Sequence, residues 1–143
     1  LHVTPFHSYP SGVTATVRKR QEYLSWANHS FLTNNVERSE SERLIIEDDF
    51  DSEFFMPGKP IDTLFMLDHH QSVIYINTFS KSLSPSIRIG YMILPEKYLE
   101  LYREKMGDFS CTVPVLDQYV LAEFIDRGHF EQHLSRVRKH REK

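Results

Sequence analysis

The sequence has almost no cysteine and no long apolar run, and each absence excludes a class of protein. Cys111 is the only cysteine among the 143 residues, so an internal disulfide and a multi-cysteine metal site are both excluded. No apolar run approaches the roughly 20 residues that a membrane-spanning helix needs. The net charge of -3 provides no general attraction to nucleic acid or anionic membranes. The scarcity of cysteine fits a cytoplasmic protein.

The two ends of the chain predict a longer natural protein. The sequence begins with Leu1 rather than Met, and no cationic segment followed by a long apolar one marks a signal peptide. It starts in a strand-like segment and stops in a strongly charged, helix-like one at 136–143. At 143 residues the chain is one domain at most, and we expect residues 1–143 to be a fragment of a larger domain.

Apolar residues follow strand-like and helix-like spacing in turn along the chain. Short apolar runs predict strands at 1–6, 44–46, 72–77 and 87–94. Helical spacing predicts helices at 13–27, 95–105, 113–126 and 129–143, with one or two helical turns at 61–67. Turns or loops are predicted at 9–12, 28–43 and 56–60. Strands that alternate with helices indicate an α/β domain in which a mostly parallel sheet is flanked by helices.

Chemically active side chains gather after two of the predicted strands. Carboxylates of the segment 47–51 follow the strand at 44–46, and the segment Thr78-Phe79-Ser80-Lys81 follows the strand at 72–77, with Arg88 further on. Ligands of open α/β sheets bind beyond the carboxyl ends of the strands, and neighbouring strands lie about 5 Å apart. A lysine beside a carboxylate, hydroxyls and an arginine suits a phosphorylated aldehyde cofactor.

Each of these motifs also has an ordinary structural explanation. A single lysine after a strand is most often a solvated surface charge, and an acidic run after a strand most often begins a helix or lies in a solvated loop. Composition and spacing by themselves therefore favour nothing more specific than a site for a phosphate-bearing ligand.

Four stretches of the chain carry a resemblance to a known family. They are TPFHSYPSGVT (4–14), LIIEDDFDSEF (44–54), VIYINTFSKSLSPSIRIGYMILP (73–95) and FIDRGHFEQHLSRVRK (124–139). In this order they resemble the aminotransferase-like domain of the MocR/GabR subfamily of GntR-type transcription regulators. That domain has the fold-type-I architecture of enzymes dependent on pyridoxal 5'-phosphate (PLP), so the chain is expected to be part of its large domain.

The resemblance implies a role for each matching residue. Lys81 is implied to form the Schiff base with PLP, and Asp48 to pair with the pyridine nitrogen of the cofactor. The residues that match the phosphate-binding positions of the family are Thr78, Ser80 and Arg88. Gly90 belongs to the same motif, where we expect it to let the backbone pass close to the site.

Two cofactor-binding positions depart from the family pattern. Phe50 stands where the family usually has a tyrosine that donates a hydrogen bond to the ring oxygen of the cofactor, and phenylalanine has no such donor. Tyr9 stands where aminotransferases usually carry an asparagine beside the same oxygen. The polar stretch 28–43 is also longer than the family usually has, and we expect it to bulge from the surface.

The resemblance also implies what the rest of the protein contributes. A winged-helix domain that reads DNA is expected on the N-terminal side, and a small domain that completes the substrate pocket on the C-terminal side. The parent protein, by which we mean the longer polypeptide that contains this chain, is then expected to be a homodimer that responds to an amino acid or amine effector. The fragment alone is expected to be inactive as an enzyme.

Two other interpretations stay open. The chain is alternatively a fragment of a class I/II PLP-dependent aminotransferase, although the EDD-x-DSEF motif at 47–54 favours the regulator. The third interpretation is a structural α/β fragment that retains no cofactor function. No metal site is predicted, because His129 and His133 have a suitable helical spacing but no evident third ligand.

Overall fold

The computed structural model describes residues 1–28, 43–54 and 61–141. Most of the polar stretch 28–43 and the whole predicted loop at 56–60 lie outside these residues, and so do the last two positions of the helix predicted at 129–143. The described elements are, in chain order, β1 (His2–Val3), α1 (Val17–Asn28), β2 (Ile45–Asp49), η2 (Ser52–Phe54), α2 (Leu64–Leu67), β3 (Val73–Thr78), α3 (Phe79–Ser82), β4 (Gly90–Ile93), η3 (Glu96–Tyr98), α4 (Leu99–Met106), α5 (Val115–Asp126) and α6 (His129–Arg141).

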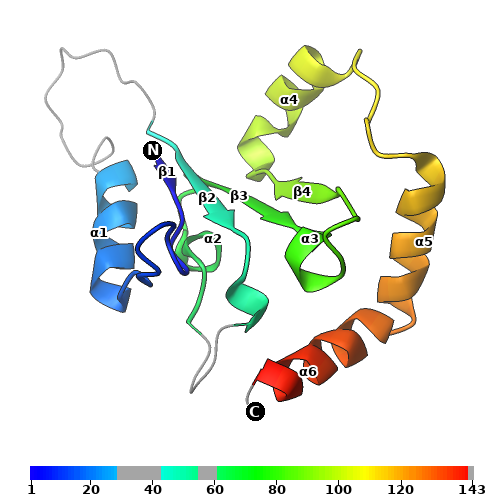
Figure 1. Cartoon of the computed structure of the whole chain (residues 1–143). Helices are drawn as coiled ribbons and strands as arrows, with labels where there is room; N and C mark the ends of the chain where they lie inside the picture. Colours follow the sequence, from blue (N-terminus) through cyan, green and yellow to red (C-terminus); the bar gives the residue numbers. More distant parts are fainter. Residues whose placement is uncertain (29–42, 55–60, 142–143) are drawn as a thin grey trace, which may run out of the picture.

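The strands form one sheet in the order β1-β2-β3-β4 (Figure 1). β2 is parallel to both β1 and β3, whereas β4 is antiparallel to β3. The prediction of an α/β domain with a mostly parallel sheet is therefore confirmed. The predicted adjacency of the strands before the acidic segment and before Lys81 is also confirmed, because Ile45–Asp49 pairs with Val73–Asn77 along its whole length.

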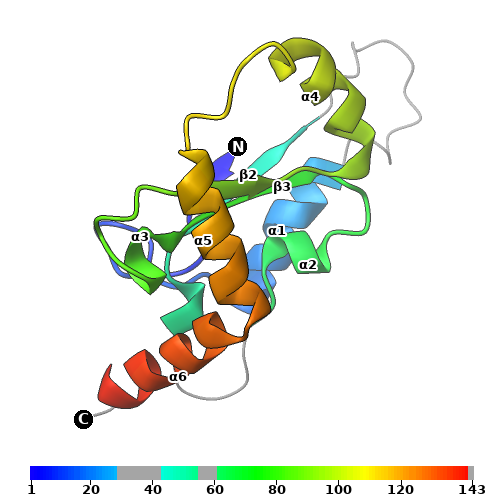
Figure 2. The ribbon, with the colours of Figure 1, turned by 90° about the vertical axis from the view of Figure 1, so that its right-hand side faces the viewer.

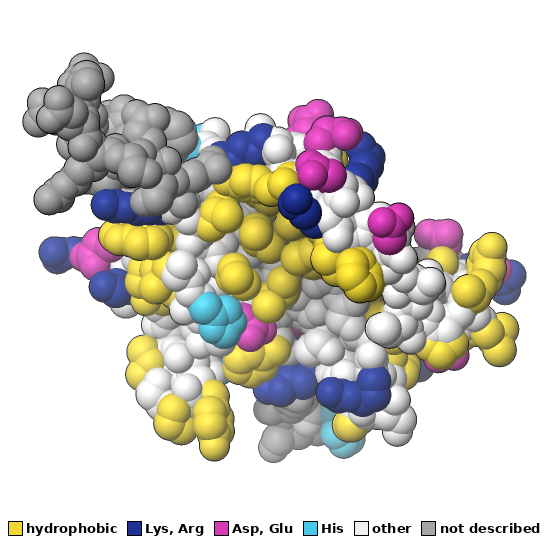
Figure 3. Space-filling view, turned by 90° about the horizontal axis from the view of Figure 1, so that it is seen from above, with side chains coloured by type: hydrophobic (Ala, Val, Ile, Leu, Met, Phe, Trp, Pro, Cys, Tyr) yellow, Lys and Arg dark blue, Asp and Glu magenta, His cyan; other side chains and the backbone are white. Residues whose placement is uncertain are grey.

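Alternation along the central strands separates two faces of the sheet. Every second residue is buried, at positions 45, 47 and 49 of β2 and at positions 73, 75 and 77 of β3. We call this side the covered face, because α1 and α2 lie below it in the side view of the molecule (Figure 2). The opposite side, which we call the open face, carries Ile46 and Met92 at 37% and 45% exposure. Hydrophobic side chains form a band across this face when the molecule is seen from above (Figure 3).

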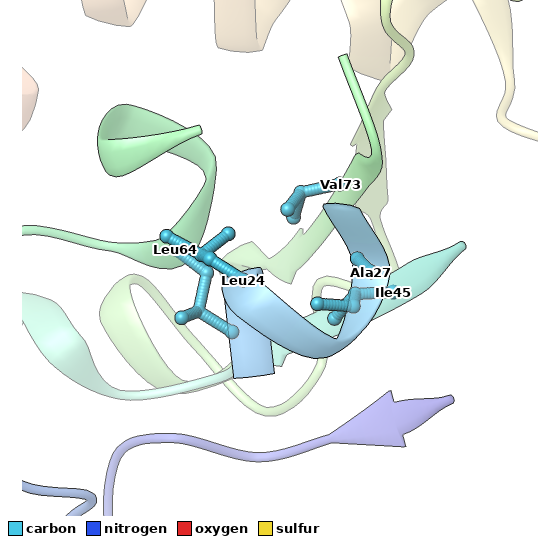
Figure 4. Packing of buried hydrophobic residues seen from close by; sticks show 5 residues of the cluster. All are labelled: Leu24, Ala27, Ile45, Leu64 and Val73. Carbon is cyan, nitrogen blue, oxygen red and sulfur yellow. The ribbon is translucent and has the colours of Figure 1, made fainter. Parts of the chain in front are cut away.

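The hydrophobic core fills the covered face. Its buried members come from α1, β2, α2 and β3, and they are Leu24, Ala27, Ile45, Leu64 and Val73 (Figure 4). Arg20, Leu24 and Ala27 are the buried residues of α1, and their spacing of four and three places them along one helix stripe. Each fully buried Leu, Ile or Val side chain stabilises the fold by about 1.5–3 kcal/mol relative to exposure.

A buried ion pair joins the loops around this core. Arg20 and Glu47 are both fully buried, with 3.8 Å between guanidinium and carboxylate. The Arg20 guanidinium also donates to the carbonyl oxygens of Pro5, Ala15 and Asp62. The Glu47 carboxylate accepts the N–H groups of Leu64 and Phe65, which the first turn of α2 leaves unpaired. The pair thus joins the segment 5–15, α1, β2 and α2.

Several predicted boundaries were wrong, for physical reasons. β2 continues through Asp49 instead of ending at Ile46, because its carboxylates find partners inside the fold. The predicted strand 87–94 shortens to β4, because residues before it hydrogen-bond as a loop around α3. The first strand shortens to His2–Val3, and the first helix begins at Val17, after a loop that Ala15 N–H closes onto the Pro5 carbonyl.

The C-terminal helices contrast with this core. No residue of α4 or α5 is buried, although α5 is rich in apolar side chains. Val115, Leu116, Tyr119 and Val120 are between 61% and 72% exposed. α6 crosses back toward the body of the molecule, where the Phe130 ring packs edge-on against Phe79 (Figure 1). Among the described residues, no helix has the length and apolarity required to cross a membrane.

Candidate cofactor site

The acidic segment at the end of β2 divides between the two faces of the sheet. Asp49 lies on the covered face, where its carboxylate accepts hydrogen bonds from the Tyr75 hydroxyl at 2.8 Å and from the Ser52 hydroxyl at 2.5 Å. Glu47 lies on the same face. Asp48 projects to the open face, since successive strand residues point to opposite sides. The strand therefore provides two structural acids and one accessible acid.

Asp48 has a histidine partner from the neighbouring strand. Its Oδ2 lies 3.2 Å from Nε2 of His2, and the side chains are 33% and 57% exposed respectively. Asp48 pairs with Ile76 in the parallel register, so Thr78, two residues further along β3, lies on the same face. Asp48 is thus a solvent-accessible carboxylate beside the carboxyl end of β3.

Lys81 lies in the short helix α3 that follows β3. Its side chain is half exposed, and its Nζ lies 3.8 Å from Oδ2 of Asp51. The same Nζ lies over the Phe50 ring, 4.1 Å from the centroid, a geometry in which the ring face attracts a cation. Phe50 and Lys81, both predicted as cofactor-binding residues, are therefore in contact. Asp48 and Lys81 have different partners in the described part of the chain.

Asp51 is shared between this lysine and a histidine of the N-terminal loop. Nδ1 of His7 lies 3.0 Å from the same Asp51 oxygen, and the Asp51 side chain is only 15% exposed. Within the described part of the chain, the other oxygen, Oδ1, is buried and has no hydrogen-bond partner. The site thus contains an unsatisfied buried carboxylate oxygen close to a half-exposed amine.

The three predicted phosphate-binding residues lie together around α3. Thr78 caps the helix by accepting the Ser80 N–H at 3.2 Å, and its hydroxyl donates to the Ile89 carbonyl. The Ser80 hydroxyl donates to the Ile87 carbonyl and accepts from Nη1 of Arg88 at 3.1 Å. These bonds fold the segment 83–89 around α3 and hold the arginine beside the serine.

Gly90 allows a close approach of two strands beside the predicted site. A Cβ at this position would lie 3.1 Å from the Asn77 carbonyl oxygen, a group of the neighbouring strand. The glycine therefore allows close pairing of β4 with β3 next to Thr78, and a role toward the cofactor stays a prediction.

Tyr9 lies apart from the residues around Lys81. It occupies the turn at 9–12 after Ser8, which pairs with Val13, and its side chain is 88% exposed. The structure does not bring Tyr9 into contact with Lys81 or Phe50. His133, named above for its helical spacing with His129, directs Nε2 to the Ser82 carbonyl oxygen at 2.9 Å. In the described ranges no cluster of three or more His, Cys, Asp or Glu residues is arranged for a metal.

Burial raises the pKa of several groups on the covered face. Loss of solvent raises the pKa of the Glu47 and Glu53 carboxyls, and hydrogen bonds from backbone N–H groups oppose this effect only in part. Burial also raises the pKa of the Tyr75 and Tyr91 hydroxyls. The proton-binding behaviour of these groups follows from the hydrophobic core and not from a ligand site.

A separate cavity lies between the 83–89 loop and α5. Its volume is about 810 Å³, and its walls include Leu83, Ile87, Arg88, Val120 and Phe124. Arg88 is its link to the residues around α3, whereas Lys81 and Asp48 are not part of its lining. This cavity is mostly apolar and does not replace the lysine site as the location of chemistry.

Comparisons with known proteins show which proteins this chain resembles. No family model matches the chain. The chain is 42% identical over 139 residues to the uncharacterized HTH-type transcriptional regulator YdeL of Bacillus subtilis, with 97% of the chain and 28% of YdeL covered. It is 32% identical to the probable rhizopine catabolism regulatory protein MocR of Rhizobium meliloti, with 97% of the chain and 26% of MocR covered. This chain is homologous to the aminotransferase-like section of MocR-type transcription regulators. It spans about a quarter of the length of these relatives.

The fold comparison agrees with this family. The chain superposes on the kynurenine aminotransferase of Pyrococcus horikoshii with a TM-score of 0.77 and 30% identity, over 96% of the chain and 31% of the enzyme. That enzyme was solved in complex with PMP. The expected fold, an α/β section of a fold-type-I aminotransferase structure, is therefore confirmed.

Sequence reasoning did not assign roles to His2, His7 or Asp51. Their contacts join residues 44 or 46 positions apart, so no local spacing reveals them. The available signal was indirect: two histidines in the first strand and loop, and a further acid immediately after Phe50.

Proposed function

We propose that this chain is part of the PLP-binding effector domain of a MocR/GabR-type transcription regulator, with Lys81 bonded covalently to the aldehyde carbon of the cofactor. The observation that carries the proposal is the position of the Lys81 amine. It lies half exposed against the Phe50 ring, directly after a strand that runs parallel to the strand of Asp48.

The other residues of the site have complementary roles in this proposal. Asp48 pairs with the pyridine nitrogen, and His2 holds the carboxylate from the open side. Arg88 and Ser80, already joined by a hydrogen bond, hold the phosphate together with Thr78. Phe50 packs beside the cofactor without donating to its ring oxygen, and Tyr9, exposed on its turn, reaches the cofactor only if that turn moves toward Lys81. PLP supplies an electron sink when a protein group holds its nitrogen protonated.

The donor set fits such a cofactor. An accessible amine, an accessible carboxylate and a guanidinium beside a hydroxyl are the groups that an aldehyde, a pyridine nitrogen and a phosphate require. The unsatisfied Oδ1 of Asp51 also leaves an acceptor near Lys81. The hydroxyls of Thr78 and Ser80 donate to carbonyl oxygens here, so phosphate binding requires them to rotate.

The regulator role extends the proposal to the parent protein. By homology with HTH-type regulators, DNA binding belongs to a different domain of that protein. We propose that the parent is a cytoplasmic homodimer in which an amino acid or amine effector, acting at the PLP site, changes the affinity for an operator. In this proposal residues 1–143 form one section of the effector domain, and the DNA reader and the small domain are other parts of the parent protein.

Absorption spectroscopy of the parent protein tests the proposal. Addition of PLP should produce the absorption band of lysine-bound cofactor, and Lys81→Ala should abolish it. Asp48→Asn should weaken cofactor retention, because an amide does not hold the ring nitrogen protonated. The control is Lys97→Ala, a lysine near Gln71 and far from α3 in the chain, which should leave the band intact. A band that survives Lys81→Ala would refute the proposal.

A second candidate is a true aminotransferase, favoured by the 30% identity with the Pyrococcus horikoshii enzyme. In that case Lys81 is the base that moves a proton on the substrate carbon. An assay of the parent with amino acid and keto acid pairs distinguishes the two: multiple turnovers favour the enzyme, whereas amine-dependent DNA binding without turnover favours the regulator.

A further inference from the structure

The proposed cofactor contacts do not use Asp51, although its carboxylate lies at the site. We infer that Asp51, held in place by His7, is a positioning residue that receives the Lys81 ammonium whenever this amine is not bonded to the cofactor. The part of this inference that concerns the cofactor rests on the proposed function. The contacts that support it lie entirely within this chain and are testable without any cofactor.

The geometry around Lys81 supports this role. Its Nζ has the Asp51 carboxylate at 3.8 Å and the Phe50 ring at 4.1 Å. The Asp51 side chain is only 15% exposed, and a largely buried carboxylate is costly without a cation or hydrogen-bond donors. At 3.8 Å the amine lies beyond hydrogen-bond distance of the oxygen. Charge therefore directs the lysine across the ring without locking it, as suits an amine that must also reach the cofactor.

His7 fixes the position of the carboxylate. Its Nδ1 lies 3.0 Å from the same Asp51 oxygen, and its backbone has a φ of 43°, in the left-handed region that non-glycine residues rarely adopt. Such conformations persist only where the surrounding structure imposes them, and they cluster at functional sites. Here the loop is closed on both sides of His7, by Ala15 N–H on Pro5 and by the pairing of Ser8 with Val13.

The other oxygen of Asp51, Oδ1, is able to accept a further hydrogen bond. Among the described residues, Oδ1 is buried and accepts no hydrogen bond. A small shift of Lys81 toward Asp51 would satisfy this oxygen, while Oδ2 keeps its contact with His7. The carboxylate can therefore hold the histidine and the free ammonium at the same time.

Side-chain NMR of lysines in the 143-residue chain tests the inference directly. The motion of the Lys81 side chain is measured through its terminal methylene and ammonium signals, with no cofactor present. Asp51→Asn should increase this motion, because only the Phe50 ring then remains beside the amine. His7→Ala should increase it by a smaller amount, because the carboxylate remains but is less well held. Asp51→Glu, which restores the charge, should recover part of the order.

Two matched variants make the result specific. Glu22→Gln removes the partner of Lys19, 3.0 Å away on α1, and should loosen Lys19 while leaving Lys81 unchanged. His129→Ala replaces an exposed histidine at the start of α6 and should leave both lysines unchanged. Unchanged Lys81 motion in Asp51→Asn would overturn the inference. Should that variant fail to fold, unchanged Lys81 motion in His7→Ala would overturn it equally. Failure of PLP to bind at Lys81 would instead refute the proposed function and leave this result standing.

Discussion

The two faces of the sheet use the same types of residue for opposite purposes. On the covered face, Glu47 and Asp49 are fully buried, and backbone N–H groups, Arg20, Ser52 and Tyr75 satisfy them. On the open face, Asp48 lies between these two acids in sequence but is partly exposed beside His2. The difference shows that alternation along a strand, and not residue type, decides which carboxylate supports the fold and which remains accessible to a ligand.

This comparison predicts that substitutions on the covered face cost stability, whereas those on the open face cost ligand binding. The largest expected loss comes from Arg20→Ala, which leaves Glu47 buried without its cation and removes donors to three carbonyl oxygens. Breaking a buried pair in this way costs about 3–5 kcal/mol. Urea unfolding of the chain measures it. Arg18→Ala, at an exposed pair with Glu22 on the same helix, is the control and should change little. An equal loss of stability in Arg20→Ala and Arg18→Ala would show that the buried pair is no more important to the fold than the exposed one.

The next largest effect is expected at the hydrophobic core. Leu64 is fully buried in α2, so Leu64→Ala should destabilise the chain by about 2–5 kcal/mol through lost contacts and a cavity. Met66, two residues away in the same short helix, is 67% exposed and provides the matched control. Thermal unfolding of the two variants should separate them clearly, and a core that tolerated Leu64→Ala as easily as Met66→Ala would contradict the packing described here.

Neighbouring acids provide the sharpest test. Asp49→Asn should cost about 1–3 kcal/mol of stability. The hydroxyls of Tyr75 and Ser52 both donate to Oδ2, whereas Oδ1 accepts the Ser52 N–H, so an amide nitrogen in place of either oxygen would face a donor. Asp48→Asn should change the stability by less than about 0.5 kcal/mol, as is usual for a surface position. Denaturant titrations of both variants under one condition compare them. A larger loss for Asp48→Asn would reverse the assignment of the two faces.

The smallest effect concerns pH. Burial raises the pKa of Glu47 in the folded chain above its ordinary value of 4.5. The folded state then holds the proton more tightly than the unfolded state, so this contribution to stability is complete below pH 4.5 and is lost as the pH rises through the raised pKa. The free energy of unfolding of the chain, measured relative to that of Glu47→Gln, should therefore fall as the pH rises above 4.5. A difference independent of pH would show that the carboxyl is not perturbed.

The sequence was sufficient for much of the fold. The apolar runs before Glu47 and Thr78 predicted β2 and β3, and the helical spacing after Pro114 predicted α5. These features are local, so the pattern of a few consecutive residues contains them. The end of β2 could not be predicted in the same way, because a run of three acids is typical of a solvated loop and becomes strand only where buried donors satisfy it.

The candidate site likewise contains local features that the sequence predicted and contacts between distant segments that it did not. The motif around Lys81 placed Thr78, Ser80 and Arg88 together correctly, since they belong to one short segment. The contacts of Lys81 with Phe50 and Asp51, and of Asp51 with His7, depend on how separate loops meet. The role of Tyr9 stays a prediction, because its side chain is exposed on its turn and makes no contact with Lys81 or Phe50.

Covalent labelling tests the central claim most directly. The parent protein is incubated with PLP, treated with borohydride, digested and mapped by mass spectrometry. We predict that the added cofactor mass is found on the peptide containing Lys81 and disappears from the protein in Lys81→Ala. Label spread evenly over surface lysines, or concentrated on another lysine, would contradict the account.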